Sequence, residues 1–487
     1  MHELSLAKLI AYSIPMSQNS DQFTKPLKSV LEHTLSYLAS LDQSRVGAAA
    51  DIPTLRARID KPLPDQGSAP EQVIADLVRN VEDGIMGSPG GRFYGWVIGG
   101  SLPAALAADW LTSAWDQNAG HSACSPAAAV VEEVAGKWLK EILGLPAEAS
   151  FALVTGCQMA HTTCLAAARQ SVLGKHGWDV GQQGLFGAPP IRIISSELRH
   201  ETFERALRLL GFGLANVTYL PTDDKGCLPA DTLKQALERN SALPTIVLLQ
   251  AGDVNSGAYD NFATLVPIAK QHHAWVHIDG AFGLWAAATP NYRHLTKDIE
   301  TADSWATDGH KWLNVPYDCG YAFVRDTQAH RAAMTASASY LPPDQNTIRN
   351  QMDWTPEWSR RARGFATYAA LRQLGRKGVA ELVDRCCRQA AALVKEIGNL
   401  PGAEVVSLAI INQGLVRFLD MKPGASEPDH DRRTDQVIAR IVSDGEAFFG
   451  GTTWRGKRAM RISVSSWQTT EEDVERVVKA ADKALKD

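Results

Sequence analysis

Between residues 151 and 279 the sequence alternates between short β-rich runs and helical patterns, and this alternation constrains the fold more than any other feature. The β-rich runs are FALVTG, IRIISS, NVTYLP, TIVLLQA and AWVHID. Helical patterns such as GCQMAHTTCLAAARQSVL, ETFERALRLLG and DTLKQALER lie between them. Successive parallel strands need a long crossover, usually a helix, to connect them. The pattern therefore predicts an α/β fold with a mostly parallel sheet, seven-stranded in type, and helices on both of its faces.

Polar residues follow several of these runs, at the positions where parallel strands would end. The first run leads into the turn TGCQ, which contains Cys157 and Gln158; His200 follows the second run, and a loop with Asn255 follows the fourth. Open α/β sheets bind ligands at the carboxyl ends of their strands. A strand-to-helix turn there offers backbone N–H groups and a helix dipole to a phosphate. Each signal is weak alone, since many such turns contain glycine and His200 would serve equally well as a helix cap.

The run AWVHID and the later motif DGHKW carry the most specific signal. AWVHID ends on Asp279, the small residue Ala281 lies in the next turn, and DGHKW supplies His310 and Lys311. Alone, the lysine would be taken for a surface residue and the aspartate for a turn cap. Together they predict pyridoxal 5′-phosphate, held by Lys311 as a Schiff base and by Asp279 at the ring nitrogen. The flat imidazole of His200 would lie against the ring.

Length, charge and cysteine content limit the remaining possibilities. A chain of 487 residues buries a large core and should divide into at least two lobes. The net charge of −5, without a Lys/Arg run, argues against nucleic acid as a partner, and no stretch is long enough to cross a membrane. Seven cysteines without a CxxC pair fit neither a metal site nor a disulfide framework, which predicts a reducing cytoplasm.

The sequence predicts three parts. Residues 1–90 carry loosely organised helical patterns, residues 91–355 would form the large cofactor-binding domain, and residues 356–487 a smaller α+β lobe. Near the end of the large domain, MTASASYLPPDQNTIRNQMDW is polar and has no clear period. Such a segment is typical of a mobile loop, and we expect it to act as a lid.

Aromatic residues indicate where a substrate could bind. Phe93, Tyr94 and Trp96 lie in the glycine-bracketed segment GGRFYGWVIGG, where close backbone approach is possible. With Trp305 they could wall an apolar pocket, which favours an aromatic or bulky apolar substrate. Plain core packing explains any one of them equally well.

One helix before the alternating region has a clear apolar repeat. In SPAAAVVEEVAGKWLKEILGL, Val130, Val134, Trp138 and Ile142 recur every four residues, which predicts that they form its buried face. Ser125 and the proline after it are a typical helix start, with the serine as N-cap.

Taken in order, these motifs resemble the group II pyridoxal-phosphate-dependent decarboxylases, the family of aromatic amino acid, histidine and glutamate decarboxylases. RFYGWVIGGSLPAALAADWL is similar to the family's substrate-side segment, and GDVNSGAYD to its Gly-Thr-Thr-x-x-Gly-x-x-Asp loop. HIDGAFG and GHKWLN carry its aspartate and lysine. The resemblance extends from about Gly91 to Gly375, more loosely to the C-terminus, and is closest to the aromatic branch.

The resemblance implies a PLP-dependent transferase-like fold (fold type I), a homodimer, and decarboxylation of an L-amino acid through a lysine Schiff base and a quinonoid intermediate. It places Ala281 and Asn255 beside the cofactor. The phosphate would be held by Cys157, Gln158 and His310, although the turn TGCQMA departs from the Gly-, Ser- and Ala-rich turn of relatives.

A second departure leaves other reactions open. Relatives carry a loop tyrosine that returns a proton to the substrate, whereas here Gln351 falls near that place and the nearest tyrosine is Tyr340. Replacing this tyrosine can divert the chemistry in the family. The alternatives are therefore a carbon–carbon lyase, a deaminase or an oxygen-using aldehyde synthase. A non-catalytic binding relative is a further alternative, against which the retained Asp279, His200 and Lys311 speak.

Overall fold

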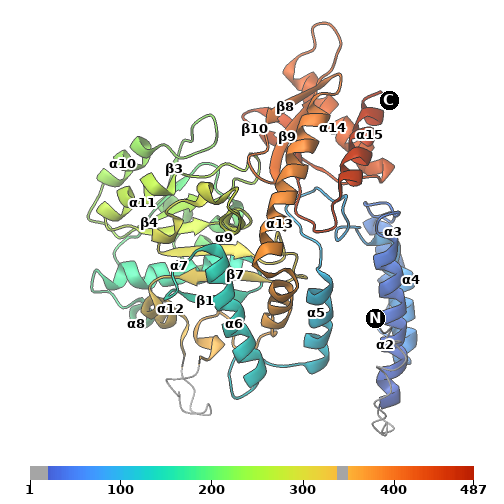
Figure 1. Ribbon diagram of the computed structural model, residues 1–487. Coiled ribbons are helices and arrows are strands. Elements are labelled where there is room, and N and C mark those ends of the chain that lie inside the picture. Colours follow the sequence, from blue (N-terminus) through green and yellow to red (C-terminus); the bar gives the residue numbers. More distant parts are fainter. Residues whose placement is uncertain (1–19, 337–348, 487) are drawn as a thin grey trace.

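A seven-stranded sheet forms the centre of the molecule, in the order β1-β7-β6-β5-β4-β2-β3 (Figure 1). The computed structural model describes residues 20–336 and 349–486. The strands are β1 (Ser150–Val154), β2 (Arg192–Ser196), β3 (Val217–Leu220), β4 (Thr245–Gln250), β5 (Trp275–Asp279), β6 (Ser304–Asp308) and β7 (Gly320–Val324). Within this sheet β7 is antiparallel to both neighbours and the other pairs are parallel. The predicted mostly parallel α/β sheet is confirmed.

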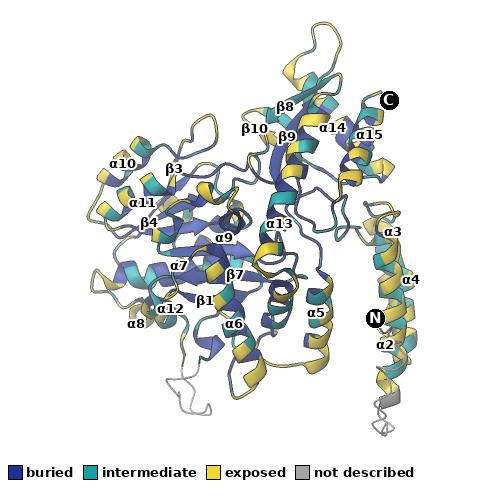
Figure 2. Cartoon of the chain, viewed as in Figure 1, coloured by how far each residue is buried: buried dark blue, intermediate teal, exposed yellow. Residues whose placement is uncertain are grey.

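Both faces of the sheet are covered by helices. On β4, Ile246 and Leu248 belong to the apolar cluster of α7 and α9, whereas Val247 and Leu249 belong to the cluster that includes α6, α10 and α11. Alternate residues of a strand point to opposite faces, so both faces are buried (Figure 2). The helices of this part are α5 (Pro103–Trp115), α6 (Pro126–Leu143), α7 (Cys157–Gly174), α8 (Val180–Gln183), α9 (Glu201–Leu209), α10 (Ala230–Glu238), α11 (Phe262–Gln271) and α12 (Thr327–Met334).

A smaller lobe follows, built on an antiparallel sheet in the order β10-β11-β9-β8. Its elements are β8 (Ala403–Ser407), β9 (Gln413–Phe418), α14 (Glu427–Asp444), β10 (Gly450–Trp454), β11 (Lys457–Ser463) and α15 (Glu471–Lys486). The long helix α13 (Gly364–Gly398) reaches from the large domain into this lobe (Figure 1). The expected α+β character of the C-terminal part is confirmed.

The N-terminal helices form an arm at the edge of the molecule. They are α2 (Ser20–Ser40), α3 (Ile52–Ile59) and α4 (Pro70–Val81). α2 and α4 lie side by side and apart from the central sheet (Figure 1). The arm is tied to the body by Arg92, which donates hydrogen bonds to the carbonyl oxygens of Asp42 and Ser44 at 2.7 and 2.9 Å.

Helix α6 begins where the sequence predicts, but its buried face differs in part. Ser125 caps the helix by accepting a hydrogen bond from a backbone N–H of the first turn. Of the four predicted residues, Ile142 is buried, Val134 and Trp138 are half-buried and Val130 is exposed. The buried residues are Ala128, Ala129, Glu132, Ala135, Gly136, Leu139, Ile142 and Leu143. A methyl group at Gly136 would collide with the ring of Phe151 on β1. The predicted face is therefore correct at Ile142 and wrong at Val130, because small residues such as Gly136 face the sheet where the helix approaches it closely.

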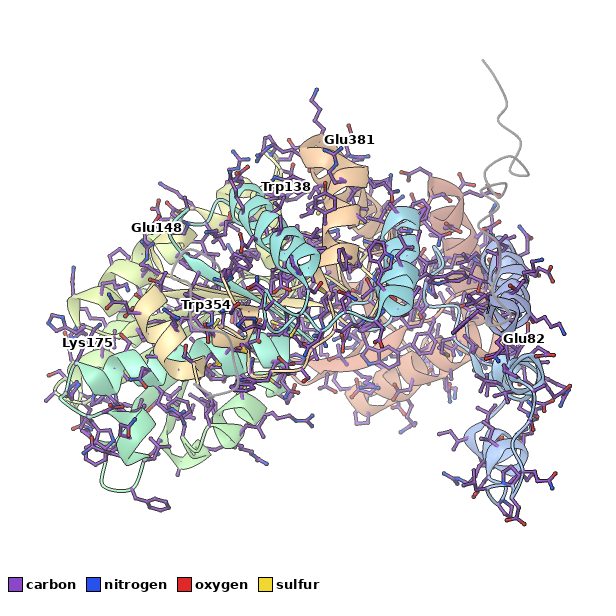
Figure 3. The ribbon with its side chains drawn as sticks, turned by 90° about the horizontal axis from the view of Figure 1, so that it is seen from below. Glu82, Trp138, Glu148, Lys175, Trp354 and Glu381 are labelled. Atoms are coloured by element: carbon purple, nitrogen blue, oxygen red, sulfur yellow. The ribbon has the colours of Figure 1, made fainter. Side chains whose placement is uncertain are left out.

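Two further predictions from the sequence are that no segment crosses a membrane and that the polar segment before residue 355 acts as a lid. Charged side chains such as Glu148, Lys175 and Glu381 extend from the periphery (Figure 3). Among the helices that the structure describes, none combines the length and the apolar character needed to cross a bilayer. The predicted lid falls largely on residues 337–348, which include Tyr340 and lie outside the described residues. Gln351 is described and is buried, with its side-chain oxygen accepting a hydrogen bond from Arg349.

Candidate active site

A cavity of about 270 Å³ lies where the parallel strands end. Residues predicted from the sequence line it: Cys157, Gln158, His200, Asp279, Ala281, His310 and Lys311. They come from the start of α7, the residue before α9, the end of β5 with its turn, and the turn after β6. The sheet thus gathers around one cavity groups that are far apart in the sequence.

The register of the sheet explains why these groups meet. Gln250, at the end of β4, is paired with Asp279 on β5. Asp308 at the end of β6 and Val154 at the end of β1 are both opposite Gly320 of β7. A methyl group at Gly320 would collide with the backbone of the turn before α7. Glycine at this position therefore lets the N-terminus of α7 approach the strand ends closely.

Lys311 is the amine of the site. Its Nζ lies 3.0 Å from Oδ2 of Asp308. Burial alone would lower the pKa of Lys311, but Asp308 raises it above its ordinary value. The turn that carries Lys311 is supported from outside by Gly99, which donates its N–H to the carbonyl oxygen of His310 at 3.3 Å. A methyl group at Gly99 would overlap the carbonyl oxygen of Lys311, so the turn requires glycine as its neighbour.

Asp279 is the buried acid of the site. Its carboxylate lies 3.6 Å from Nε2 of His161, a residue of α7. Burial would raise the pKa of Asp279, but His161 and the charged amine of Lys311 hold it below its ordinary value. The carboxylate is therefore ionised at neutral pH, which is the state that a protonated pyridine nitrogen requires of its partner.

His200 is both a helix cap and a wall of the cavity. Its Nδ1 accepts a hydrogen bond from the backbone N–H of Thr202 at 3.3 Å and lies 2.8 Å from the Thr202 hydroxyl. Burial lowers the pKa of His200, so the ring is neutral and carries its proton on Nε2. The structure confirms His200 as a helix cap and places its ring in the cavity wall, whereas its stacking on a bound ring stays a prediction.

The N-terminus of α7 offers a backbone N–H to an anion. In this structure the N–H of Cys157 is donated to Oδ1 of Asp308 at 2.6 Å. His310 lies beside the same carboxylate, with 3.4 Å between Nε2 and Oδ1. Its Nδ1 accepts a hydrogen bond from Cys319 N–H, and burial lowers its pKa, so Nε2 carries the proton. An anion at this end of the cavity would meet two donors and one competing carboxylate.

Asn255 is not brought to the cavity. Its side-chain oxygen accepts a hydrogen bond from the Thr452 hydroxyl of β10 at 2.8 Å, which links its loop to the small lobe. Gly252 and Val254 of the same loop line the cavity instead. A role for Asn255 beside the cofactor stays a prediction.

The four predicted aromatic residues also lie outside the cavity lining. Phe93 stacks on Phe448 with 4.9 Å between ring centroids, and Tyr94 packs against another phenylalanine of the small lobe. Trp305 is buried on β6 and donates its indole N–H to a backbone oxygen. Trp96 is 55% exposed. Their role as a substrate pocket stays a prediction.

Three residues that were not predicted from the sequence lie at or beside the site: His161, His277 and Asp308. Spacing could have found them. Cys157 and His161 are one helical turn apart on α7, and His277 and Asp279 point to the same face of β5. Asp308 precedes Lys311 by three residues in DGHK, close enough for the ion pair in the turn.

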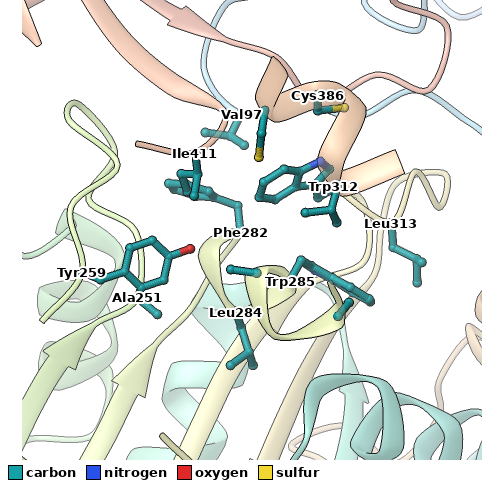
Figure 4. Close-up of a cluster of buried hydrophobic side chains, with 14 of the residues drawn as sticks. Val97, Ala251, Tyr259, Phe282, Leu284, Trp285, Trp312, Leu313, Cys386 and Ile411 are labelled. Carbon is teal, nitrogen blue, oxygen red and sulfur yellow. The ribbon is translucent and has the colours of Figure 1, made fainter. Parts of the chain in front are cut away.

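A cluster of large apolar side chains closes the site toward the small lobe (Figure 4). Phe282 lines the cavity and also belongs to this cluster. Trp312, the residue after Lys311, is fully buried there. Val97 and Ile411 reach the same cluster from the glycine-bracketed segment and the small lobe (Figure 4). The cluster packs against the lysine turn on the side that faces away from the cavity and excludes water from that side.

The fold and the site define an α/β enzyme whose lysine and acid share one ligand cavity at the strand ends. The model of the "Pyridoxal-dependent decarboxylase conserved domain" matches residues 53–419. The chain belongs to this family, whose cofactor is pyridoxal phosphate and whose members are carboxy-lyases.

Individual relatives agree with this assignment. An aromatic-L-amino-acid decarboxylase of Bacillus atrophaeus is 25% identical over 459 residues, covering 91% of this chain and 92% of the relative. A phenylacetaldehyde synthase of Arabidopsis thaliana is 23% identical over 487 residues, covering 95% and 98%. The crystal structure of Oryza sativa TDC with PLP and tryptamine superimposes with a TM-score of 0.90 at 24% identity, covering 97% of this chain and 99% of that chain. The fold is therefore that of fold type I pyridoxal phosphate enzymes.

The residues of the cavity fit this cofactor. A lysine amine and an ionised acid line the same cavity, a neutral imidazole forms part of its wall, and a helix N-terminus faces it. These are the groups that an aldehyde, a protonated pyridine ring and a phosphate require. The carboxylate of Asp308 departs from an ordinary phosphate site, because it accepts the Cys157 N–H that a phosphate would use.

Proposed function

We propose that this chain decarboxylates an aromatic L-amino acid with pyridoxal phosphate held on Lys311. One observation carries the proposal: the Lys311 amine and the ionised carboxylate of Asp279 line the same buried cavity. The aromatic preference is supported by the similarity to the aromatic-L-amino-acid decarboxylase of Bacillus atrophaeus.

The residues of the chain would divide the work as follows. Lys311 supplies the amine that holds the cofactor's aldehyde, and Asp279 keeps a proton on the ring nitrogen. The bound cofactor accepts the electron pair that remains when the substrate carboxylate leaves as carbon dioxide. His200 presents its ring to the cofactor and orients the substrate. When its Nζ is not bonded to the cofactor, Lys311 would be the group that gives a proton to the substrate carbon or takes one from it.

The phosphate end is formed by the start of α7 and the turn after β6. Cys157 and Gln158 contribute at the helix N-terminus, and the Nε2–H of His310 is a further donor. Burial, with acids nearby, raises the pKa of the Cys157 thiol well above its ordinary value. The thiol therefore stays neutral and does not repel a phosphate.

A second candidate is an oxygen-dependent aldehyde synthase that acts on the same substrates. The similarity to a phenylacetaldehyde synthase favours it. So does Gln351, which stands near the place of the family's loop tyrosine and is buried against Arg349 rather than lining the cavity. Decarboxylation yields an amine and carbon dioxide, whereas the synthase reaction consumes oxygen and water and yields an aldehyde, carbon dioxide, ammonia and hydrogen peroxide. Mass spectrometry of the products with each aromatic L-amino acid distinguishes the two.

The test of the proposed function is Lys311→Ala. The variant should lose turnover and the borohydride-reducible adduct with pyridoxal phosphate while its circular dichroism stays that of the parent. Lys175→Ala is the matched control, because Lys175 is exposed (Figure 3) and does not line the cavity. Retained turnover in Lys311→Ala would rule out the mechanism.

We also propose that the protein is a cytoplasmic homodimer. Within each chain we propose domain boundaries at residues 90 and 355. Support for the dimer comes from α2, which exposes a row of large apolar residues four apart: Phe23, Leu27, Leu31 and Leu35. A second copy is the natural partner for an arm that otherwise stands apart from its own sheet (Figure 2). All seven cysteines are unpaired, which supports a reducing compartment.

A further inference from the structure

A chain of polar side chains leads from Asp279 into the core, and no step described above uses it. His161 lies 3.6 Å from Asp279, measured from Nε2 to Oδ2. Its Nδ1 is 2.8 Å from Nε2 of His277 on β5, and Nδ1 of His277 is 2.9 Å from the hydroxyl of Ser304. Trp275 donates its indole N–H to that hydroxyl at 2.9 Å.

Burial makes this arrangement more than ordinary packing. His161, His277 and Ser304 are all fully buried. Placing polar rings in a core is unfavourable unless each N–H and each lone pair finds a partner. Burial, with His161 beside it, lowers the pKa of His277 well below its ordinary value, so His277 is neutral. A neutral imidazole has one donor and one acceptor, which makes the direction of the chain a definite question.

The direction follows from the one acceptor that cannot be reversed. The ionised carboxylate of Asp279 only accepts, so a proton on Nε2 of His161 must face it. At the other end of the chain, Ser304 accepts the indole N–H of Trp275 at one lone pair and still has its own O–H to give. When Ser304 donates to Nδ1 of His277, the proton of His277 is on Nε2 and is donated to Nδ1 of His161. The proton of His161 is then on Nε2, the atom that lies 3.6 Å from Oδ2 of Asp279 and 3.5 Å from the sulfur of Cys157. In the opposite direction, a neutral His161 would turn a lone pair toward the carboxylate, which is repulsive.

We propose that His161 is a positioning residue for the cofactor's acid: oriented by His277 and Ser304, it directs an N–H at Asp279 and keeps that carboxylate ionised and fixed. The inference rests on the proposed function, because it concerns Asp279 as the partner of the cofactor's ring nitrogen. His161 is absent from the cavity lining described above, so it acts through Asp279 and not on the cofactor directly.

The first test uses the unmodified holoenzyme. Long-range ¹H–¹⁵N spectra of ¹⁵N-histidine-labelled protein report which ring nitrogen of each histidine carries the proton. We expect His161 and His277 both to carry it on Nε2 alone, with the signals assigned through His161→Gln. A proton on Nδ1 of His161 with a bare Nε2 overturns the proposal.

The second test compares His161→Phe with His161→Gln, whose amide can still offer an N–H to Asp279. The readouts are the dissociation constant of pyridoxal phosphate from the apoprotein, by fluorescence quenching, and the ¹⁵N shift of the labelled pyridine nitrogen. In His161→Phe we expect affinity to fall by about tenfold, equivalent to one unit in the pKa of the acid. The nitrogen signal should move toward the unprotonated position, whereas His161→Gln should retain most of both properties.

The control is His330→Phe. His330 is also fully buried and hydrogen-bonded, with Nδ1 2.8 Å from the Ser150 hydroxyl, but it is not part of the cavity. The His330→Phe variant should be less stable than the parent. Its affinity for pyridoxal phosphate and the ¹⁵N shift of the pyridine nitrogen should be unchanged.

The outcomes separate this inference from the proposed function. Unchanged affinity and an unchanged nitrogen signal in His161→Phe overturn the inference alone; if that variant does not fold, the imidazole spectra and His161→Gln decide. Absence of a Lys311 adduct in the unmodified protein overturns the proposed function itself.

Discussion

At the scale of single residues, opposing effects decide the charge of each buried group. Lys311 and Asp279 are both buried, and burial alone would favour their neutral forms. Asp308 keeps the amine charged, while His161 and its neighbours keep the acid charged. Asp308 also accepts the N–H at the start of α7. One carboxylate therefore restrains both the amine and the phosphate end until the cofactor arrives.

Asp308→Asn should make the cofactor adduct form faster at neutral pH. Only the neutral amine attacks an aldehyde, and the pKa of Lys311 is raised by Asp308, so adduct formation speeds up as pH rises and Lys311 loses its proton. Removing the charge of Asp308 lowers that pKa and moves the midpoint to lower pH. At neutral pH the rate should rise roughly tenfold for each unit of change in pKa. Stopped-flow absorbance after mixing apoprotein with pyridoxal phosphate measures the rate of adduct formation at each pH.

Asp420→Asn, a change in the small lobe away from the cavity, is the control for this experiment and should leave the pH profile unaltered. An unshifted midpoint in Asp308→Asn would show that another group sets the charge of Lys311.

At the scale of elements, close approach of backbones holds the site together. The segment around Gly99 touches the lysine turn, and Gly320 admits the start of α7. Neither contact leaves space for a side chain. Sequence periodicity does not reveal such contacts, which is also why the buried face of α6 was predicted only in part.

Gly99→Ala should destabilise the protein and weaken cofactor binding together, because the added methyl group displaces the carbonyl of Lys311. Overpacking of this kind lowers the free energy of unfolding by about 1–3 kcal/mol. Urea denaturation and a cofactor titration measure the two effects. Gly67→Ala is the matched control, since no atom lies within 4 Å of the added methyl. Equal behaviour of the two variants would argue against a tight contact at Gly99.

Glu132→Ala should lower the free energy of unfolding more strongly. Glu132 on α6 and Arg360 are both fully buried, with 2.7 Å between Oε2 and Nη1. Removing one partner leaves a buried charge unpaired, which typically costs about 3–5 kcal/mol. Glu133→Ala, at the next and less buried position, should change stability little. Chemical denaturation of both variants provides the comparison, and a small loss in Glu132→Ala would mean that water reaches Arg360.

At the scale of the whole molecule, the arm formed by α2 and α4 is the part least explained by a single chain. Its exposed apolar row should be covered by a second copy if the protein is a dimer. Helices in proteins gain most of their stability from packing, and isolated helices are only marginally stable in water. An arm with so little support from its own domain therefore needs a partner.

Combined Leu27→Glu and Leu35→Glu should therefore convert the dimer to a monomer, because two charges would have to enter an apolar interface. Size-exclusion chromatography with light scattering measures the mass. Leu63→Glu is the control: Leu63 is 92% exposed in the connector between α3 and α4 and should tolerate the charge. A dimer that survives the double change would place the interface elsewhere.

The sequence alone predicted a mostly parallel sheet with helices on both faces and named Lys311 and Asp279 as the candidate amine and acid, because strand and helix periods and the residues after each strand are local properties of the chain. Only the tertiary structure decided which predicted residues meet. It joined Asp308 to Lys311, placed the His161–His277 pair behind Asp279, and left Asn255 and the aromatic residues outside the cavity. The reason is physical: strand register and close helix packing bring together side chains, such as His161 and Asp279, that are far apart in the sequence.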